Sequence, residues 1–439
     1  MTGPAGAPSE RPASYRAVFG VREFRFLFTG HLLSLIGDQL VRVALAILVY
    51  DSTDSAFLAA VTFGISYAPW VLGGPLLSTF ADRMRRRSVL VGSDLIRGVV
   101  VACLALPGIP LWLMLALLFA TSLLAPPFES ARSALMPDVL AGDRYAVGTS
   151  VTNIGIQIAQ VLGFLAGGAL VLAISPRGAL LINAATFLLS AALVRFGVDD
   201  RPAASVVPGA PTSVLRQTAD GLRLLIRNRA LLRIVALLWL GQLFVTAPEG
   251  IAAPFAAQFG HGALEVGLFL AANPLGMVLG AVVIGRLCPP TLRARLTYPL
   301  AMLSVLALIP AGLTGNFVVV LVLLVVSGFG ASYLIPLNVS FVRAVPSAYR
   351  GRAFGVAVSG LYACQGVATV VAGSLAEQIP ATAVVTWSGA LGVLALAALG
   401  VVSVRGRSGK PAIDLIGDAF GSPADPLPPH EGQTSGTIE

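Results

Sequence analysis

Apolar stretches of about twenty residues recur along almost the whole chain, and this feature limits the possible fold more than any other. An α-helix needs about 20 consecutive apolar residues to cross a bilayer, so stretches of this length are typical of membrane spans. Only 11% of the 439 residues are charged, whereas soluble domains carry roughly 25%. The sequence therefore predicts an all-α polytopic membrane protein and excludes a soluble enzyme of ordinary composition.

Twelve transmembrane helices are expected, arranged as two pseudo-symmetric six-helix bundles. The first six spans are placed at 24–50, 56–80, 88–107, 110–130, 145–174 and 177–196, and the second six at 229–258, 263–287, 295–314, 317–340, 353–378 and 381–404. This predicts a tail over 1–23, an N-terminal bundle over 24–196, a linker over 197–228, a C-terminal bundle over 229–404 and a disordered tail over 405–439.

The arginines predict the orientation of the spans. Basic residues gather in every second connection, in the linker and after Arg405, whereas the opposite connections hold only Arg177. Short cytoplasmic loops collect Lys and Arg, so we expect both termini in the cytosol. No secretory cleavage site follows the first residues. Every basic residue except Lys410 is an arginine, which is typical of GC-rich bacterial genomes and favours a bacterial inner membrane.

The linker contains a segment with the pattern of an amphipathic helix, expected over 214–227. Its apolar positions are Val214, Leu215, Leu222, Leu225 and Ile226, and its arginines are Arg216, Arg223 and Arg227. A helix of this kind lies on the inner leaflet, or it serves as a solvated connector. The sequence leaves both interpretations open.

The two halves of the chain repeat each other. An offset of 207 pairs Gly73 with Gly280, and an offset of 205 pairs Gly155 with Gly360. A few matched glycines can arise by chance in a glycine-rich chain, but nearly constant offsets across corresponding spans favour duplication. Duplicated six-span bundles occur in many secondary transporters, whose substrate sites lie near the midplane between the halves.

The connection after the second span carries a recognisable motif. It runs from Ser78 to Arg87 and reads STFADRMRRR. This resembles the signature loop of the major facilitator superfamily, Gly-x-x-x-Asp-Arg/Lys-x-Gly-x-Arg/Lys-Arg/Lys, with matches at Asp82, Arg83, Arg86 and Arg87. Ser78 and Arg85 stand where the family usually has glycine. A plain topogenic loop would need the arginines but not the aspartate.

The resemblance implies a cytoplasmic gate. In the family this loop latches the cytoplasmic side in the outward-facing state, which implies that role for Asp82 and Arg83 together with Arg86 and Arg87. An Asp beside Arg at helix ends can pair with basic groups or helix N-termini of the other half. The corresponding loop of the second half supplies Arg350 and Arg352 as expected partners, and Asp94 and Arg97 are expected to brace the loop from the third span.

Further stretches point to one branch of the superfamily. Asp38 and Arg42 in the first span, with the run Asp-Leu-Ile-Arg from Asp94 to Arg97 in the third, look like the branch of macrolide and siderophore exporters among drug:proton antiporters. The run GFLAGG from Gly163 to Gly168 is similar to the antiporter motif Gly-Pro-x-x-Gly-Gly without its proline, although simple helix packing also explains it. The arginine motif of the family's fourth span is not apparent. The resemblance covers residues 15–405.

Three charged residues inside predicted spans are the candidates for proton coupling or gating: Asp38, Arg42 and Glu249. An ionisable group at the centre of a bilayer costs about 2.5–3.5 kcal/mol, so it normally faces a cavity or a partner. Asp38 and Arg42 are four residues apart and can pair on one helix face. Glu249 lies between Pro248 and Gly250, where we expect the helix to be interrupted. Its offset from Arg42 is 207, so the two should approach each other, either as a coupling pair or as a static ion pair.

Uncharged polar residues in the spans predict a substrate cavity. Such groups line a cavity or bond between helices, and the candidates for the lining are Gln157, Gln160, Asn273, Tyr362 and Gln365. Glu129 follows two prolines near the end of the fourth span. It is either a solvated loop residue, which we slightly favour, or an entrance carboxylate for cationic substrates.

These observations favour a secondary transporter that exports amphiphilic small molecules by proton antiport. The alternative is a uniporter or importer of a polar metabolite. An enzyme is not expected, because no nucleophile motif, metal-ligand spacing or phosphate-binding loop is present. We expect no cofactor and no metal, a monomer in the lipid bilayer, and protons and a small molecule as partners. Nucleic-acid binding is excluded because the arginines form small separate clusters.

Overall fold

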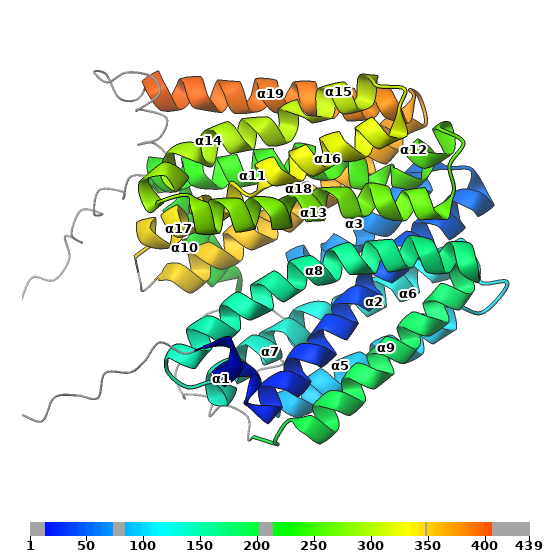
Figure 1. Cartoon of the computed structure of the whole chain (residues 1–439), viewed down its shortest axis with the longest axis vertical. Helices are drawn as coiled ribbons and strands as arrows, with labels where there is room; N and C mark the ends of the chain where they lie inside the picture. The colour runs from blue at the N-terminus through cyan, green and yellow to red at the C-terminus, as the bar shows by residue number, and fades with distance from the viewer. Residues whose placement is uncertain (1–13, 73–83, 202–213, 347–348, 406–439) are drawn as a thin grey trace, which may run out of the picture.

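Helices are the regular elements of the computed structural model, which describes residues 14–72, 84–201, 214–346 and 349–405. Figure 1 shows their arrangement. Up to the linker they are α1 (Tyr15–Phe19), α2 (Arg22–Thr53), α3 (Ala56–Leu72), α5 (Arg86–Leu104), α6 (Leu111–Leu123), α7 (Ala125–Val139), α8 (Asp143–Ala173) and α9 (Pro176–Gly197). From the linker onward they are α10 (Val214–Arg227), α11 (Arg229–Gly250), α12 (Ala252–Gln258), α13 (Ala263–Leu287), α14 (Pro290–Leu306), α15 (Leu308–Leu313), α16 (Phe317–Ala331), α17 (Leu334–Ala344), α18 (Arg350–Ala376) and α19 (Ala381–Arg405).

Ten stretches of the described residues are long and apolar enough to cross a membrane, and three of them combine two labelled helices: Leu111–Val139, Pro290–Leu313 and Phe317–Ala344. Two of the expected spans are not among the ten. The apolar helix α3 is shorter and borders residues 73–83, which the structure does not describe. Helix α5 carries four charged residues, namely Arg86, Arg87, Asp94 and Arg97. The ten apolar helical stretches confirm the prediction of an all-helical, multi-pass membrane protein.

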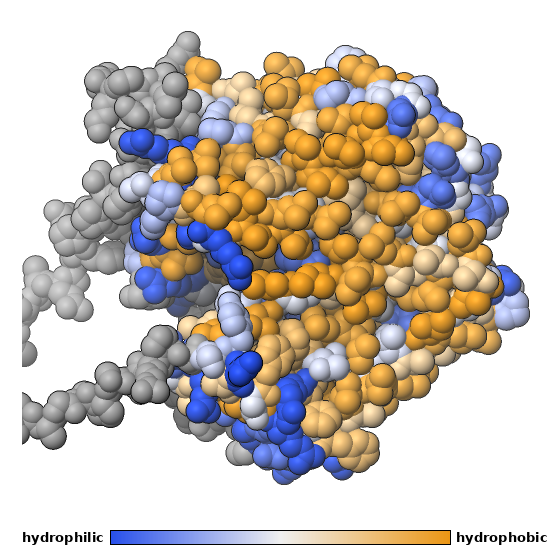
Figure 2. Space-filling view, viewed as in Figure 1, coloured by the Kyte–Doolittle hydropathy of each residue, from blue (hydrophilic) through white to orange (hydrophobic). Residues whose placement is uncertain are grey.

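The surface suits a lipid environment. Figure 2 shows apolar side chains over most of one face, with polar side chains gathered toward two opposite sides of the view. Large apolar residues are exposed in the middle of helices, for example Leu162 in α8 and Leu394 in α19. Exposed apolar area on this scale marks a surface that contacts lipid or protein rather than water.

The helices fall into two groups that meet mainly at one end. In Figure 1 most of the helices up to α9 lie below those from α11 onward, α3 reaches up beside α18, and the two groups approach each other on the right. We call this the far end, because α10 lies at the opposite, linker end. The two groups pack together through α8 against α13 and through α3 against α18.

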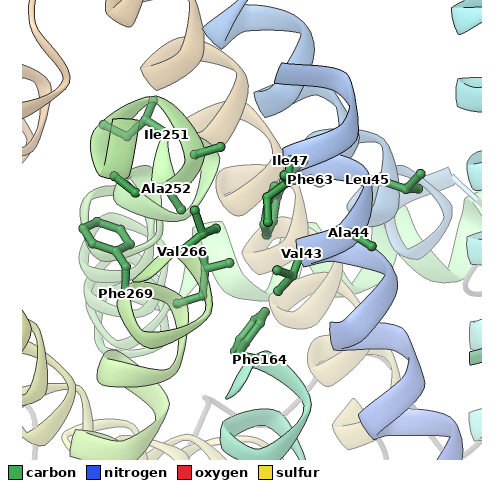
Figure 3. Close-up of a cluster of buried hydrophobic side chains, with 14 of the residues drawn as sticks. Val43, Ala44, Leu45, Ile47, Phe63, Phe164, Ile251, Ala252, Val266 and Phe269 are labelled. Atoms are coloured by element: carbon green, nitrogen blue, oxygen red, sulfur yellow. The ribbon is translucent and has the colours of Figure 1, made fainter. Parts of the chain in front are cut away.

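An apolar core closes the far end. It joins residues from both groups, including Val43 and Ile47 of α2, Phe164 of α8, Ile251 beside α12 and Phe269 of α13, and Figure 3 shows these side chains gathered between the helices. At the linker end the cores separate. One, around Leu90 and Leu135, belongs to the first group, and the other, around Tyr333 and Leu300, belongs to the second. The burial of apolar surface therefore holds the halves together at one end only.

Small residues allow the closest approach at the far end. A Cβ added to Gly168 of α8 would lie 2.6 Å from the carbonyl oxygen of Ala263, and one added to Gly267 of α13 would lie 2.6 Å from the carbonyl oxygen of Phe164. Real Cβ atoms are not found this close to a backbone oxygen. In α8, Gly163 and Gly167 face α2 instead. The glycine run therefore packs α8 on two sides, which agrees with its helix-packing interpretation.

Candidate functional site

A central cavity of about 460 Å³ lies between the two groups of helices. This is within the range of about 300–1,000 Å³ that is usual for small-molecule sites. Both groups contribute to its lining, and the polar lining residues include His31, Ser34, Asp38, Gln39, Arg42, Tyr67, Arg97, Glu129, Gln157, Gln160, Gln242, Glu249, Asn273, Tyr362 and Gln365. All five residues predicted to line a cavity, and all three candidates for coupling, are in this set.

Asp38 is paired with Arg97 and not with Arg42. Arg97 Nη2 of α5 lies 2.5 Å from Asp38 Oδ1, and its guanidinium carbon lies 4.4 Å from the centre of the Phe187 ring. The predicted pair with Arg42 was wrong, because four-residue spacing on α2 does not outweigh the partners offered by α5 and α3. Arg97 is 3% exposed, whereas the Asp38 side chain is 28% exposed. The pair is therefore reachable from the cavity through the carboxylate.

Asp94 lies behind this pair, away from the cavity. It is fully buried, and it accepts hydrogen bonds from Ser34 Oγ of α2 at 3.2 Å and from Ser190 Oγ of α9 at 2.5 Å. Arg97 Nη1 lies 3.8 Å from Asp94 Oδ1. We predicted that Asp94 and Arg97 brace the loop after the second span. In the structure this face of α5 is directed toward α2 and α9, and Arg97 lines the cavity. Residues 73–83 of the loop are not described, so the bracing role stays a prediction.

A second polar chain crosses between the two groups of helices. Arg42 Nη1 of α2 donates to the Tyr67 hydroxyl of α3 at 3.4 Å, and that hydroxyl donates to Glu249 Oε2 of α11 at 3.1 Å. The Arg42 guanidinium also lies 5.0 Å from the centre of the Tyr67 ring. The predicted approach of Arg42 and Glu249 is thus mediated by Tyr67. The predicted interruption beside Glu249 is confirmed, since α11 ends at Gly250.

Aromatic rings from both groups form one wall of the cavity. The Tyr362 ring of α18 stacks on Trp70 of α3 with centroids 4.8 Å apart, and it faces Tyr67 at 6.0 Å. Tyr67 is 4% exposed. This wall offers a flat apolar surface to a guest, and aromatic side chains suit partners that are partly apolar.

Amide side chains fill much of the remaining wall. Gln365 Nε2 donates to Gln242 Oε1 at 3.4 Å, and Asn273 Nδ2 donates to Ser327 Oγ at 3.4 Å. Gln157 and Gln160 of α8 also line the cavity. Bonds of this length are weak, so these amides keep hydrogen-bonding capacity for a ligand.

Glu129 also lines the cavity, so the preference for a solvated loop residue was wrong. It belongs to α7, where it forms an ion pair with Arg132 one turn away, and its Oε2 lies 3.9 Å from Nε2 of the buried His31. His31 stacks on Phe128 with centroids 6.0 Å apart. Helix α7 follows α6 almost directly, and the two form one apolar stretch. The two prolines near the start of α7, Pro126 and Pro127, are both buried. Two prolines in succession indicated a loop, but they occupy the first positions of α7, which proline tolerates.

Sequence reasoning missed Tyr67, His31 and Ser34 as site residues. One signal was available, because His31, Ser34, Asp38 and Arg42 follow each other at intervals of three or four residues and therefore share one face of α2. Tyr67 carried no comparable signal. A tyrosine in an apolar helix usually packs or marks an interface, and only the tertiary structure brings it to Glu249.

The predicted gate residues have the following positions. Arg86 pairs with Asp138 of α7, Arg87 lies 3.5 Å from Asp200, and Arg352 of α18 lies 3.7 Å from Asp220 of the linker helix α10. Arg350 is the first residue of α18. Asp82 and Arg83 lie outside the described residues, as do most of the two predicted tails. The cross-half contacts expected for this loop therefore stay a prediction.

The described residues contain no group of three or more His, Cys, Asp or Glu side chains that could hold a metal ion. The three cysteines, Cys103, Cys288 and Cys364, are unpaired. The ionisable groups around the cavity are instead arranged as carboxylates with arginines or hydroxyls. Such groups can bind protons and polar ligands.

The arrangement of helices around a central cavity agrees with the family to which the sequence is related. The profile of the Major Facilitator Superfamily matches residues 27–369. The chain belongs to this superfamily. It is a multi-pass membrane transporter and not an enzyme, as predicted.

Relatives of this superfamily transporter include proteins named for efflux. The chain is 26% identical to the uncharacterized MFS-type transporter YfiS of Bacillus subtilis over 365 residues, which is 80% of this chain and 86% of YfiS. It is 21% identical to macrolide efflux protein A of Streptococcus pyogenes over 280 residues, 60% of this chain and 66% of that protein. It is 33% identical to the putative bacilysin exporter BacE of Bacillus subtilis over 170 residues, 38% of this chain and 42% of that protein.

The fold is shared with solved transporters. A crystal structure of a POT family transporter in complex with a thioalcohol-conjugated peptide superposes with a TM-score of 0.68 at 15% sequence identity, covering 88% of this chain and 96% of that chain. This likeness concerns the fold alone.

Proposed function

We propose that this transporter exports amphiphilic small molecules, of drug-like, macrolide-like or siderophore-like size, by proton antiport and alternating access. The observation that carries the proposal is the cavity between the two groups of helices, which holds carboxylates whose partners come from other helices. The proposed location is a bacterial inner membrane, with both termini and the linker end in the cytosol, and the transporter acts as a monomer.

We further propose twelve spans in two pseudo-symmetric six-helix bundles. The starts of corresponding helices support this arrangement, since Arg22 and Arg229, Ala56 and Ala263, and Asp143 and Arg350 begin helices and are each 207 residues apart. A duplicated bundle of this kind can rock about a site at the interface of its halves. In the conformation described here, the apolar core closes the far end, so the cavity faces the linker end.

Proton exchange follows from the two polar connections at the cavity. A proton that binds to the Glu249 carboxylate removes its negative charge, so the charge of Arg42 loses its partner across Tyr67. A proton that binds to Asp38 likewise releases Arg97. An ion pair inside the membrane is favourable only while both members are charged. Proton uptake therefore changes the free energy of the contacts that hold this conformation, and release of the substrate is coupled to re-formation of the pairs.

The amphiphilic character of the substrate follows from the chemistry of the walls. The stacked Trp70 and Tyr362 rings accept an apolar part of the guest, whereas the amides of Gln160 and Gln365 accept hydrogen-bonding groups. The names of the macrolide efflux protein and the bacilysin exporter agree with this class of substrate.

The test is a proton-flux assay in proteoliposomes loaded with the pH dye pyranine, under an imposed pH gradient. Lipophilic cations, macrolides and siderophores are added in turn to native protein and to the Asp38→Asn and Glu249→Gln variants. Asp51→Asn is the matched control, because Asp51 lies on the same helix as Asp38 but is exposed at the far end.

We expect a substrate-dependent proton flux in native protein and in the control, and its loss in at least one of the cavity variants. Binding or uniport of a compound without any proton flux would overturn the antiport mechanism. That outcome would favour the alternative, a uniporter or importer of a polar metabolite.

A further inference from the structure

Arg97 lies between two carboxylates that differ in their access to the cavity. Its Nη2 atom is 2.5 Å from Asp38, whose side chain is 28% exposed, and its Nη1 atom is 3.8 Å from Asp94, whose side chain is fully buried. The Nε atom of Arg97 has no hydrogen-bond partner. The guanidinium thus makes a close contact with Asp38 on one side and a longer one with Asp94 on the other.

We propose that Arg97 is a two-position switch and that Asp94 is its second partner. This rests on the proposed proton coupling at Asp38. In the present state Arg97 lies much closer to Asp38 than to Asp94. When Asp38 binds a proton from the cavity, Arg97 moves to Asp94. Asp94 is therefore a positioning residue for proton exchange, and it does not itself carry the transported proton.

The surroundings of Asp94 suit this role. Two serine hydroxyls, Ser34 Oγ from α2 and Ser190 Oγ from α9, donate to its oxygens and hold the buried carboxylate in a fixed orientation. The Phe187 ring of α9 covers the guanidinium. A buried carboxylate with hydroxyl donors and a nearby arginine is stable without access to water.

The other charged and titratable groups near the switch come from α2 and α7. From α2 these are His31 and Arg42, and from α7 they are Glu129 and Arg132. Glu129 is already paired with Arg132, and Arg42 is bonded to Tyr67. Because these groups have partners of their own, Asp94 is the buried anion best placed to receive Arg97.

The sign of the effect follows from charge. In native protein a negative Asp94 repels a negative Asp38 and also offers Arg97 a partner once Asp38 is neutral. Both effects favour protonation of Asp38. The Asp94→Asn substitution removes both, so Arg97 stays on Asp38. Protonation of Asp38 in this variant then needs a lower pH.

The experiment measures the carboxylic acid C=O stretch by infrared difference spectroscopy during a pH titration of the full-length protein in nanodiscs, with proton flux in proteoliposomes as a second readout. The Asp38 band is identified by its loss in Asp38→Asn. In Asp94→Asn we expect the midpoint of that band to move at least one pH unit lower, a tenfold increase in the proton concentration required. Asp51→Asn serves as the control and should titrate like native protein.

The outcomes separate this inference from the proposed function. A shifted midpoint without any substrate-driven proton flux in native protein would support the switch and overturn antiport. A proton flux in native protein with an unchanged midpoint and unchanged flux in Asp94→Asn would overturn the switch and leave antiport standing. A band that vanishes in Asp94→Asn but persists in Asp38→Asn would identify Asp94 as the protonated group, which also contradicts the proposal. The Ser190→Ala variant, which keeps the charge and removes one hydroxyl, checks the fold and should shift the midpoint less than Asp94→Asn.

Discussion

At the far end, the carboxylate of Glu377 in the second group of helices binds the N-terminus of α3 in the first group. Glu377, which follows α18, accepts hydrogen bonds from Ser55 Oγ at 2.7 Å and from the backbone N–H of Phe57 at 2.8 Å, at the N-terminus of α3. Backbone N–H groups at a helix start lack partners inside the helix, and the helix dipole favours a negative charge there. We therefore predict that the Glu377→Ala substitution weakens the closure of the far end.

The size of this effect can be estimated from the contact. A side chain that caps a helix N-terminus contributes about 1 kcal/mol, and exposure to solvent keeps the charge contribution of Glu377 small. A change of about 1 kcal/mol corresponds to roughly a fivefold shift in a conformational equilibrium. We expect Glu377→Ala to increase the ratio of far-end-open to far-end-closed molecules about fivefold at neutral pH. Glu377→Gln, which keeps an oxygen acceptor but loses the charge, should have a smaller effect.

The contact also predicts a dependence on pH. The hydrogen bonds from the Phe57 N–H and the Ser55 hydroxyl hold the pKa of Glu377 below its usual value of 4.5. Because the closed state binds the ionised form more tightly, the stabilisation is fully present above pH 4.5 and is lost as the pH falls through the lowered pKa. The difference between native protein and Glu377→Ala should therefore disappear in strong acid.

The assay is a distance measurement by double electron–electron resonance between spin labels at Leu106 and Leu313. Both residues are exposed, and both lie at the far end. The labels are placed in a variant without the three native cysteines. An unchanged distance distribution in Glu377→Ala at neutral pH would refute the reasoning, as would a difference from native protein that persists in strong acid.

Three further predictions concern substitutions of single residues. The Tyr67→Phe substitution keeps the ring but leaves the partly buried Glu249 without its hydroxyl donor, so the conformation with the cavity open to the linker end should lose about 2 kcal/mol, measured with the same pair of labels. The Gly168→Val substitution should shorten the time spent with the far end closed, because its Cβ would lie 2.6 Å from the carbonyl oxygen of Ala263, the first residue of α13; an unchanged distance distribution between the two labels would contradict this. In Gly276→Ala the added Cβ would lie 1.9 Å from a backbone oxygen of α16, so thermal unfolding in detergent should show a loss of about 1–3 kcal/mol without a change in far-end distances.

The sequence predicted the location of the site better than its connections. Asp38 and Glu249 were identified as single charges in apolar stretches, and both line the cavity. Their partners were not identified. Asp38 pairs with Arg97, 59 residues away, and Glu249 is bonded to Tyr67, 182 residues away. Spacing along one helix reports only on that helix, so it favoured Arg42 as the partner of Asp38.

The helix boundaries show the same limit. Most spans were placed within a few residues, because apolar stretches and their charged ends are local properties of the chain. The two prolines before Glu129 indicated a loop, but they begin α7, which carries Glu129 to the cavity. The direction of a helix after such a break depends on what the neighbouring helices contact, and this information is not local.

By itself, the sequence determined that the chain is a multi-pass membrane protein with charged groups that need partners inside the membrane, because the cost of placing each residue in lipid depends on that residue and its immediate neighbours. Only the tertiary structure decided which carboxylate meets which arginine, and that a shared apolar core closes the far end beside a cavity lined by both groups of helices. These features arise from contacts between helices far apart in the chain, and the energy of each contact exists only once the helices have packed.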